Sequence, residues 1–187
     1  MRPAEPARRR VPPLLAAAAA IALAVGPARG EGLAKGAAFR FEDKGGAELR
    51  LVLTGRGEAG RQWALFPAGG DTALMRFEEN ADGRMVRLEQ GGVTWRFEPH
   101  DCARSLGICE FEMSGNGTAT RYQRVTGREE GAWVYSLFEM RDTGPEPVRI
   151  GTVRYDENGV PLAEDWTDLE TVTTGSLRRI GPRAEWR

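Results

Sequence analysis

CEFEMSGNGTATRYQRVT, residues 109–126, contains the pattern that decides the fold of this chain. Cys109, Phe111 and Met113 alternate with polar side chains, as they do in a β-strand with one buried face. Gly-Asn-Gly at 115–117 predicts a tight turn, and another strand-like segment follows at 119–126. The stretch therefore predicts an antiparallel β-hairpin.

The same pattern continues on both sides of this hairpin, and turn sequences rich in Gly, Asn and Asp separate its segments. The additional strand-like segments are 39–41, 49–53, 62–66, 74–78, 85–89, 93–97, 132–141 and 148–155. No helical periodicity precedes residue 160. The sequence therefore predicts a mainly all-β fold, an antiparallel meander of about nine to ten strands that forms a barrel or a strongly curved half-barrel.

The C-terminal part of the chain has a different pattern. Pro161 can begin a helix, and Leu162, Trp166 and Leu169 follow at mixed spacings of three and four. This spacing predicts a short C-terminal helix within 161–175, and a short strand at 169–174 is the alternative.

The N-terminal residues 1–30 have the features of a cleavable secretory signal peptide. Arginines open the segment, an apolar block follows at 11–25, and small residues at Ala28 and Gly30 predict cleavage before Glu31. The block is shorter than the roughly 20 residues that span a bilayer, so we expect no stable membrane span after cleavage. We expect a bacterial periplasmic or secreted protein, exported by general secretion rather than by the twin-arginine route, with residues 31–187 as a single antiparallel β domain.

The charge of the exported part argues against nucleic acid as a partner. The chain has 26 basic and 27 acidic side chains, and the signal peptide holds five arginines and one glutamate, which leaves 21 basic and 26 acidic side chains. These charges are interspersed, whereas nucleic-acid-binding proteins gather positive charge on one face.

The two cysteines predict a structural disulfide. Cys102 and Cys109 are the only cysteines, and an exported chain enters an oxidising compartment. Their spacing of seven does not match a redox pair, which has two intervening residues. We therefore expect a disulfide that pins the loop between two strands.

No convincing catalytic or metal-binding constellation is found. His100 is the only histidine, and Asp101 follows it, which leaves an envelope hydrolase as a second alternative function. The sequence lacks a nucleophile-elbow serine, a phosphate-binding loop and a dinucleotide fingerprint. We expect a non-enzymatic protein with no cofactor and no metal.

The segment 132–140 departs from the pattern, because both of its faces are apolar. Either it crosses the centre of the sheet, with a helix or an N-terminal segment covering its outer face, or one of its faces lines a cavity for an apolar ligand. The candidate apolar pocket consists of Trp95, Phe97, Phe111, Met113, Trp133, Tyr135 and Leu137.

In outline, export, a long meander and a turn of the type Y-D-x-x-G-x-P at 155–161 resemble the periplasmic half-barrels of the lipoprotein-carrier kind. That resemblance implies acyl chains held in the concave face of the sheet. Two main functions are open: a binder of an apolar small molecule or lipid, and a solidly packed structural or interaction module. In the module, an envelope protein partner would dock on a sheet edge or on Leu106 and Ile108 of the disulfide loop.

Overall fold

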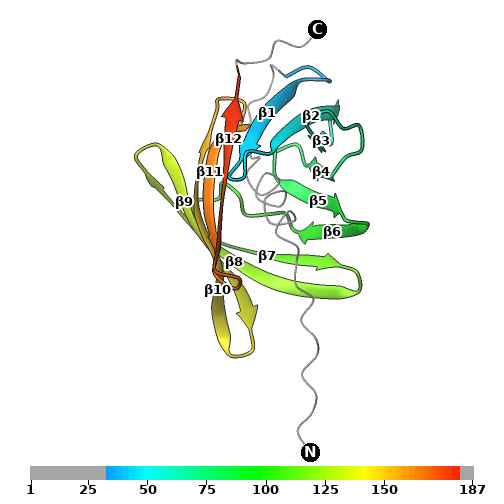
Figure 1. The fold of residues 1–187 in the computed structure, drawn as a ribbon. Coiled ribbons are helices and arrows are strands. Elements are labelled where there is room, and N and C mark those ends of the chain that lie inside the picture. Colours follow the sequence, from blue (N-terminus) through cyan, green and yellow to red (C-terminus); the bar gives the residue numbers. More distant parts are fainter. Residues whose placement is uncertain (1–32, 182–187) are drawn as a thin grey trace, which may run out of the picture.

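The sheet closes because each strand pairs with its neighbours in the chain and the first strand also pairs with the last (Figure 1). The computed structural model describes residues 33–181. The twelve strands are β1 (Ala38–Asp43), β2 (Glu48–Gly57), β3 (Gly60–Pro67), β4 (Met75–Glu79), β5 (Met85–Gln90), β6 (Val93–Glu98), β7 (Gly107–Gly115), β8 (Thr118–Glu129), β9 (Ala132–Arg141), β10 (Gly144–Tyr155), β11 (Pro161–Asp168) and β12 (Thr173–Ile180). The predicted all-β antiparallel barrel is confirmed, with two strands more than the upper expectation. The predicted signal peptide at 1–30 lies outside the described residues.

Short turns join the strands, and acidic or amide side chains stabilise several of them. Asp43 Oδ1 accepts the backbone N–H groups of Gly45 and Ala47, at 2.8 and 2.9 Å. Asp156 Oδ1 accepts those of Asn158 and Val160, both at 2.9 Å, in the predicted turn at 155–161. A side chain that replaces a backbone acceptor in this way is the reason that Asp is frequent in tight turns.

The predicted C-terminal helix is wrong. Residues 161–175 contain β11, the turn before β12, and the first residues of β12. Glu164 and Trp166 point inward, two residues apart, which is the period of a strand. The spacing that suggested a helix came from residues of β11 taken together with the turn residues Leu169 and Val172. The alternative strand at 169–174 is also wrong for most of its length, because residues 169–172 form this turn.

The inner wall of the barrel has two chemical parts. Strands β1 to β6 contribute mostly apolar side chains, and Phe41, Leu51, Leu65 and Phe77 are among the most deeply buried. Strands β8 to β11 contribute buried polar groups as well, including Arg124, Arg149 and Glu164. Because strand side chains alternate between faces, these polar residues share the interior with the apolar wall.

The segment 132–140 lies within β9, and its two apolar faces point to opposite sides of the barrel wall. Tyr135 and Leu137 are buried inside, while Val134, Phe138 and Met140 are half-buried on the outer side. No helix is present in residues 33–181, so the expected helical cover for this outer face is absent there. The described part of the chain likewise has no helix that could cross a membrane.

Candidate functional site in the barrel interior

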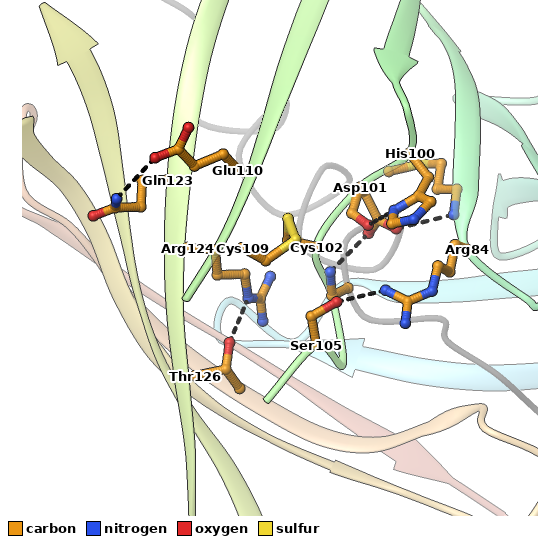
Figure 2. Close-up of a disulfide and its surroundings, with 12 residues drawn as sticks. Arg84, His100, Asp101, Cys102, Ser105, Cys109, Glu110, Gln123, Arg124 and Thr126 are labelled. Atoms are coloured by element: carbon orange, nitrogen blue, oxygen red, sulfur yellow. Dashed lines mark hydrogen bonds between the residues drawn. A yellow bond between two sulfur atoms is a disulfide. The ribbon is translucent and has the colours of Figure 1, made fainter. Parts of the chain in front are cut away.

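The disulfide loop, residues 99–106, connects β6 to β7 at one end of the barrel, which we call the loop end. The opposite end is called the far end. Strands β4, β6, β8 and β10 finish at the loop end, because successive strands of a meander alternate in direction. Cys102 and Cys109 form a disulfide with 5.8 Å between their Cα atoms (Figure 2). The disulfide therefore fixes the loop to the beginning of β7, the strand that follows it.

The disulfide loop is held inside the barrel end by its backbone. Asp101, Cys102 and Ala103 are 1, 1 and 2% exposed. The Asp101 carboxylate accepts the backbone N–H of Met85 at 3.0 Å and that of Ala103 at 3.3 Å, and the Asp101 N–H donates to the Met85 carbonyl at 2.8 Å (Figure 2). These bonds anchor the loop to the start of β5.

The same loop reaches the opposite wall through Arg104. Its guanidinium lies 3.7 Å from the centroid of the Tyr155 ring at the end of β10, and it donates to the carbonyl of Gly159 in the next turn. On the near side, Arg84 donates to the hydroxyl of Ser105 (Figure 2). The disulfide loop therefore extends across the loop end from β5 to the β10–β11 turn and covers it.

The pair of His100 and Asp101 does not have the geometry of a catalytic dyad. His100 Nδ1 lies 2.7 Å from the backbone carbonyl of Asp101, and the Asp101 carboxylate binds backbone amides (Figure 2). A general base needs its orienting carboxylate on the imidazole itself. Within residues 33–181, no group of three His, Cys, Asp or Glu side chains is placed to hold a metal.

Within and beneath the disulfide loop lies a group of buried ionisable side chains that we call the polar cluster: Asp101 and Arg104 of the loop itself, and Arg61, Glu79, Arg124 and Glu164. Arg61 Nε donates to Glu79 Oε2 at 2.7 Å, and the Trp63 indole N–H donates to the same oxygen at 2.8 Å. Across the barrel, the Tyr135 hydroxyl donates to Glu164 Oε1 at 2.9 Å. The Arg124 guanidinium lies 3.9 Å from the centroid of the Tyr135 ring.

Burial dominates the protonation behaviour of the three acids in the polar cluster. It raises the pKa of Glu79, Asp101 and Glu164 to about 7 in each case, because a carboxylate loses its hydration inside the protein. Nearby arginines oppose this rise: Arg61 and Arg104 act on Glu79, and Arg124 acts on both Asp101 and Glu164. Glu79 also acts on Asp101, and Asp101 and Glu164 share Arg124, so the cluster is electrostatically continuous from β4 to β11.

The polar cluster was not predicted from the sequence, although a pattern in the sequence could have indicated it. Arg61 stands in phase with the inward residues Trp63 and Leu65, and Glu79 stands in phase with Met75 and Phe77. A charged residue at a strand position that should face inward has two explanations. Either the strand has left the core at that point, or the charged side chain lies in the core together with a partner. Alternation alone did not distinguish these two cases.

The structure brings together four of the seven residues of the predicted pocket. Phe97 pairs with Met113 across β6 and β7, and the ring centroids of Phe97 and Phe111 are 5.9 Å apart. Trp95 packs against the same main core. Tyr122 belongs with them, with its ring 5.5 Å from that of Phe111, and was not among the predicted residues.

The three pocket residues predicted on β9 are divided between two places. Leu137 packs in the main core, whereas Trp133 and Tyr135 belong to a smaller cluster with Val153 and Tyr155. Trp133 and Tyr155 meet edge to face, with centroids 6.3 Å apart. All seven predicted residues therefore face the interior, but Trp133 and Tyr135 lie beside the polar cluster rather than with the other aromatic rings.

The outer surface has two features of its own. Leu106 and Ile108, beside the disulfide, are 60 and 69% exposed, and Ile108 pairs with the half-exposed Val125 on β8. A hollow of about 650 Å³ lies against the outer side of β9 to β12, where Ala132, Val134 and Ala163 form part of its lining. None of the seven predicted pocket residues lines this hollow.

Comparison with known proteins gives distant structural similarities only. No family model matches the sequence, and no curated protein matches it. A predicted exported protein with a YmcC-like fold from Bacteroides fragilis NCTC 9343 aligns with 83% of this chain and 96% of its own, at 10% identity and a TM-score of 0.42. A predicted lipoprotein from Parabacteroides distasonis ATCC 8503 aligns with 78% and 94%, at 10% identity and a TM-score of 0.38. Similarity at this level establishes neither a shared fold nor a shared function.

Proposed function

We propose that this protein is an exported, non-enzymatic envelope protein that binds an apolar small molecule or lipid inside its barrel. The observation that carries the proposal is the closure of twelve strands around an interior with an apolar wall. Barrels of about eight strands are just wide enough for side chains to fill them, and wider barrels enclose ligand cavities or channels.

The width of such a barrel can be worked out from strand geometry. Twelve strands spaced ~4.8 Å apart and tilted ~40° enclose a circle with a diameter of about 24 Å between opposite backbones. Two sheets whose side chains fill the gap between them lie ~10 Å apart. A circular barrel of this size therefore has room inside beyond what the side chains of its own wall occupy.

The two barrel ends differ in a way that supports entry from the far end. At the loop end, residues 101–103 of the disulfide loop are buried, and Asp101 is hydrogen-bonded to Met85 of β5. Toward the far end, Trp95, Met113 and Tyr122 pack against the core but are only half-buried. Apolar side chains that are accessible from one end are suited to an apolar ligand that enters there.

The proposal is tested on protein expressed from the full-length sequence and purified after export. Organic extraction with mass spectrometry should recover a bound apolar molecule, and N-phenyl-1-naphthylamine should bind saturably with increased fluorescence. Met113→Glu places a charge on the inner wall and should weaken binding of the dye at least about tenfold, the equivalent of ~1.4 kcal/mol. Ser114→Glu, on the outer face of the same strand, is the matched control and should leave binding unchanged.

Absence of an extractable molecule together with absence of saturable dye binding would contradict the proposal. Export is tested separately, by cell fractionation and by sequencing of the mature N-terminus. We expect the protein in the periplasm or the medium, beginning at Glu31.

A second candidate function is an interaction module, and the exposed apolar pair Leu106 and Ile108 favours it. A fixed loop that presents large apolar side chains to solvent is typical of a docking site for another protein. Leu106→Asp should abolish capture of an envelope protein in a cross-linking pull-down. Val172→Asp is the control, because Val172 is an exposed apolar residue in a different turn. Equal capture by the wild type and Leu106→Asp would count against this function.

A further inference from the structure

We propose that the ligand is an amphiphile with a neutral, hydroxyl-bearing polar group, which binds against the polar cluster while its apolar part lies along the apolar wall. This inference rests on the proposed function, because it specifies the ligand class for the same interior. It uses the polar cluster, which binding of a purely apolar molecule would not require.

The polar cluster contains two buried acceptor oxygens that are open to a ligand group. Glu79 Oε1 and Glu164 Oε2 are buried and have no hydrogen-bond partner among the residues that the structure describes. The Glu79 side chain is 0% exposed and Glu164 is 2% exposed. A buried polar atom without a partner is costly, and native proteins normally satisfy it with protein, water or ligand.

A hydroxyl is the type of group that suits these two oxygens. Each carboxyl has one oxygen engaged, Glu79 with Arg61 and Trp63, and Glu164 with Tyr135. The remaining oxygen accepts a hydrogen bond when the carboxyl is ionised, and it can carry the proton when the carboxyl is neutral. A hydroxyl both donates and accepts, so it can bond to either form. Because burial brings both carboxyls close to half ionisation near neutral pH, this versatility matters.

The charges of the polar cluster also restrict the kind of ligand group that it can bind. The polar cluster contains three arginines, Arg61, Arg104 and Arg124, and three acids, Glu79, Asp101 and Glu164. Farther along the interior, Arg149 lies 3.5 Å from Asp168. Because the three acids are only partly ionised near neutral pH, the arginine charges exceed theirs, and an ammonium group would add to this excess in a medium that screens charges weakly. A carboxylate has no hydrogen to donate to an ionised Glu79 or Glu164 oxygen, so a neutral hydroxyl is the group that suits both forms.

The polar cluster lies directly beside apolar side chains of the interior. Trp63 contacts Glu79 through its indole N–H and also stacks near Phe77, with centroids 6.2 Å apart. Tyr135 likewise binds Glu164 while its ring is buried in an apolar cluster. The polar and apolar parts of the interior are therefore contiguous, as the two parts of one amphiphile require.

The test compares four ligands with the same twelve-carbon chain by competition with N-phenyl-1-naphthylamine at pH 7. They are 1-monolauroylglycerol, methyl laurate, laurate and dodecylammonium. We expect 1-monolauroylglycerol to bind about tenfold or more tightly than each of the others, because a single added hydrogen bond of ~1.4 kcal/mol gives that factor.

A variant then locates the interaction. Glu164→Met removes the unpartnered oxygen, and we expect it to reduce the preference for 1-monolauroylglycerol over methyl laurate to about threefold or less. Glu42→Met, on the exposed outer face of β1, should keep the full preference. If Glu164→Met does not fold, as judged by circular dichroism, the four-ligand series on the wild type still tests whether the hydroxylated ligand is preferred.

The outcomes separate this inference from the function on which it rests. Saturable binding of all four ligands without a preference for the hydroxylated one would overturn the inference and leave the proposed function standing. Tighter binding of laurate or dodecylammonium, or an unchanged preference in Glu164→Met, would also overturn it. No binding of any ligand or of the dye would overturn both.

Discussion

Replacing Glu164 by glutamine should stabilise the protein at alkaline pH and leave its stability unchanged in acid. Glu164 is 2% exposed, and burial raises its pKa from the ordinary value of 4.5 to about 7. Glutamine is neutral at every pH and retains an oxygen that can accept the Tyr135 hydroxyl, which lies 2.9 Å from Glu164 Oε1. The substitution therefore removes the ionisation and keeps the hydrogen bond.

The direction follows from proton binding in the two states. The folded protein holds the Glu164 proton more tightly than the unfolded chain does, so ionisation of Glu164 opposes folding. Its favourable contribution is complete below pH ~4.5 and is lost as the pH rises to ~7. A pKa change of one unit corresponds to ~1.4 kcal/mol, so the total loss in the free energy of unfolding is about 3 kcal/mol. The loss is no steeper than about 1.4 kcal/mol per pH unit. Glu164→Gln should exceed the wild type by up to about 3 kcal/mol at pH 8.

Urea unfolding of ligand-free protein, followed by tryptophan fluorescence at pH 5, 6, 7 and 8, measures this difference. Glu42→Gln is the control, because Glu42 is exposed on the outer face of β1 and its substitution should shift stability by less than ~0.5 kcal/mol at every pH. A stability difference between Glu164→Gln and the wild type that does not grow from pH 5 to pH 8 would refute the reasoning, because it would mean that Glu164 keeps its ordinary pKa in the folded state.

Three other predictions concern stability. Replacing Cys102 and Cys109 by serine opens an eight-residue loop and should lower the free energy of unfolding by about 2.5 kcal/mol in urea titrations, and equal stability with and without the disulfide would contradict this loop-entropy estimate. Gly175→Ala should destabilise by about 1–3 kcal/mol, because the added Cβ would overlap the Trp166 indole, whereas Gly127→Ala meets no atom within 4 Å and should change stability by less than ~1 kcal/mol in the same assay. Asp101→Ala leaves the buried amides of Met85 and Ala103 without their acceptor, so it should lower the free energy of unfolding by about 2–4 kcal/mol. It should also speed hydrogen exchange in the disulfide loop, and unchanged exchange at 99–106 would show that Asp101 does not anchor the loop.

The strands up to residue 155 could be predicted because their apolar and polar side chains alternate with a period of two. Phe111 and Met113 alternate with glutamates on β7, and Asn116-Gly117 supplies a turn with positive φ at both residues. The tail could not be predicted in the same way. In β11, Ala163 and Asp165 alternate with the inward side chains. The turn that follows contributes Leu169 and Val172, so the spacing of the apolar residues across strand and turn resembled that of a helix.

That the seven residues line a pocket stays a prediction; the strand period indicated the direction of their side chains and did not indicate their neighbours. The strand period places Trp133, Tyr135 and Leu137 on one face, and all three point into the barrel. Which residues they meet depends on register with β8 and β10, and a shift of one residue would exchange every facing pair. Tyr122 joins Phe111 for the same reason, and no local pattern indicates that contact.

The sequence by itself determined the strands up to residue 155, the turns between them and the cysteine pair, because alternation, turn residues and spacing are local properties of the chain. Closure of the sheet and assembly of the polar cluster were decided only by the tertiary structure. Glu79 and Glu164 are 85 residues apart in the chain, and they belong to one cluster only because the disulfide loop crosses the barrel end, where Asp101 interacts with Glu79 and shares Arg124 with Glu164. Burial and pairing of a charge are decided together, by contacts between segments that are distant in sequence, and that is why alternation could not reveal the polar interior.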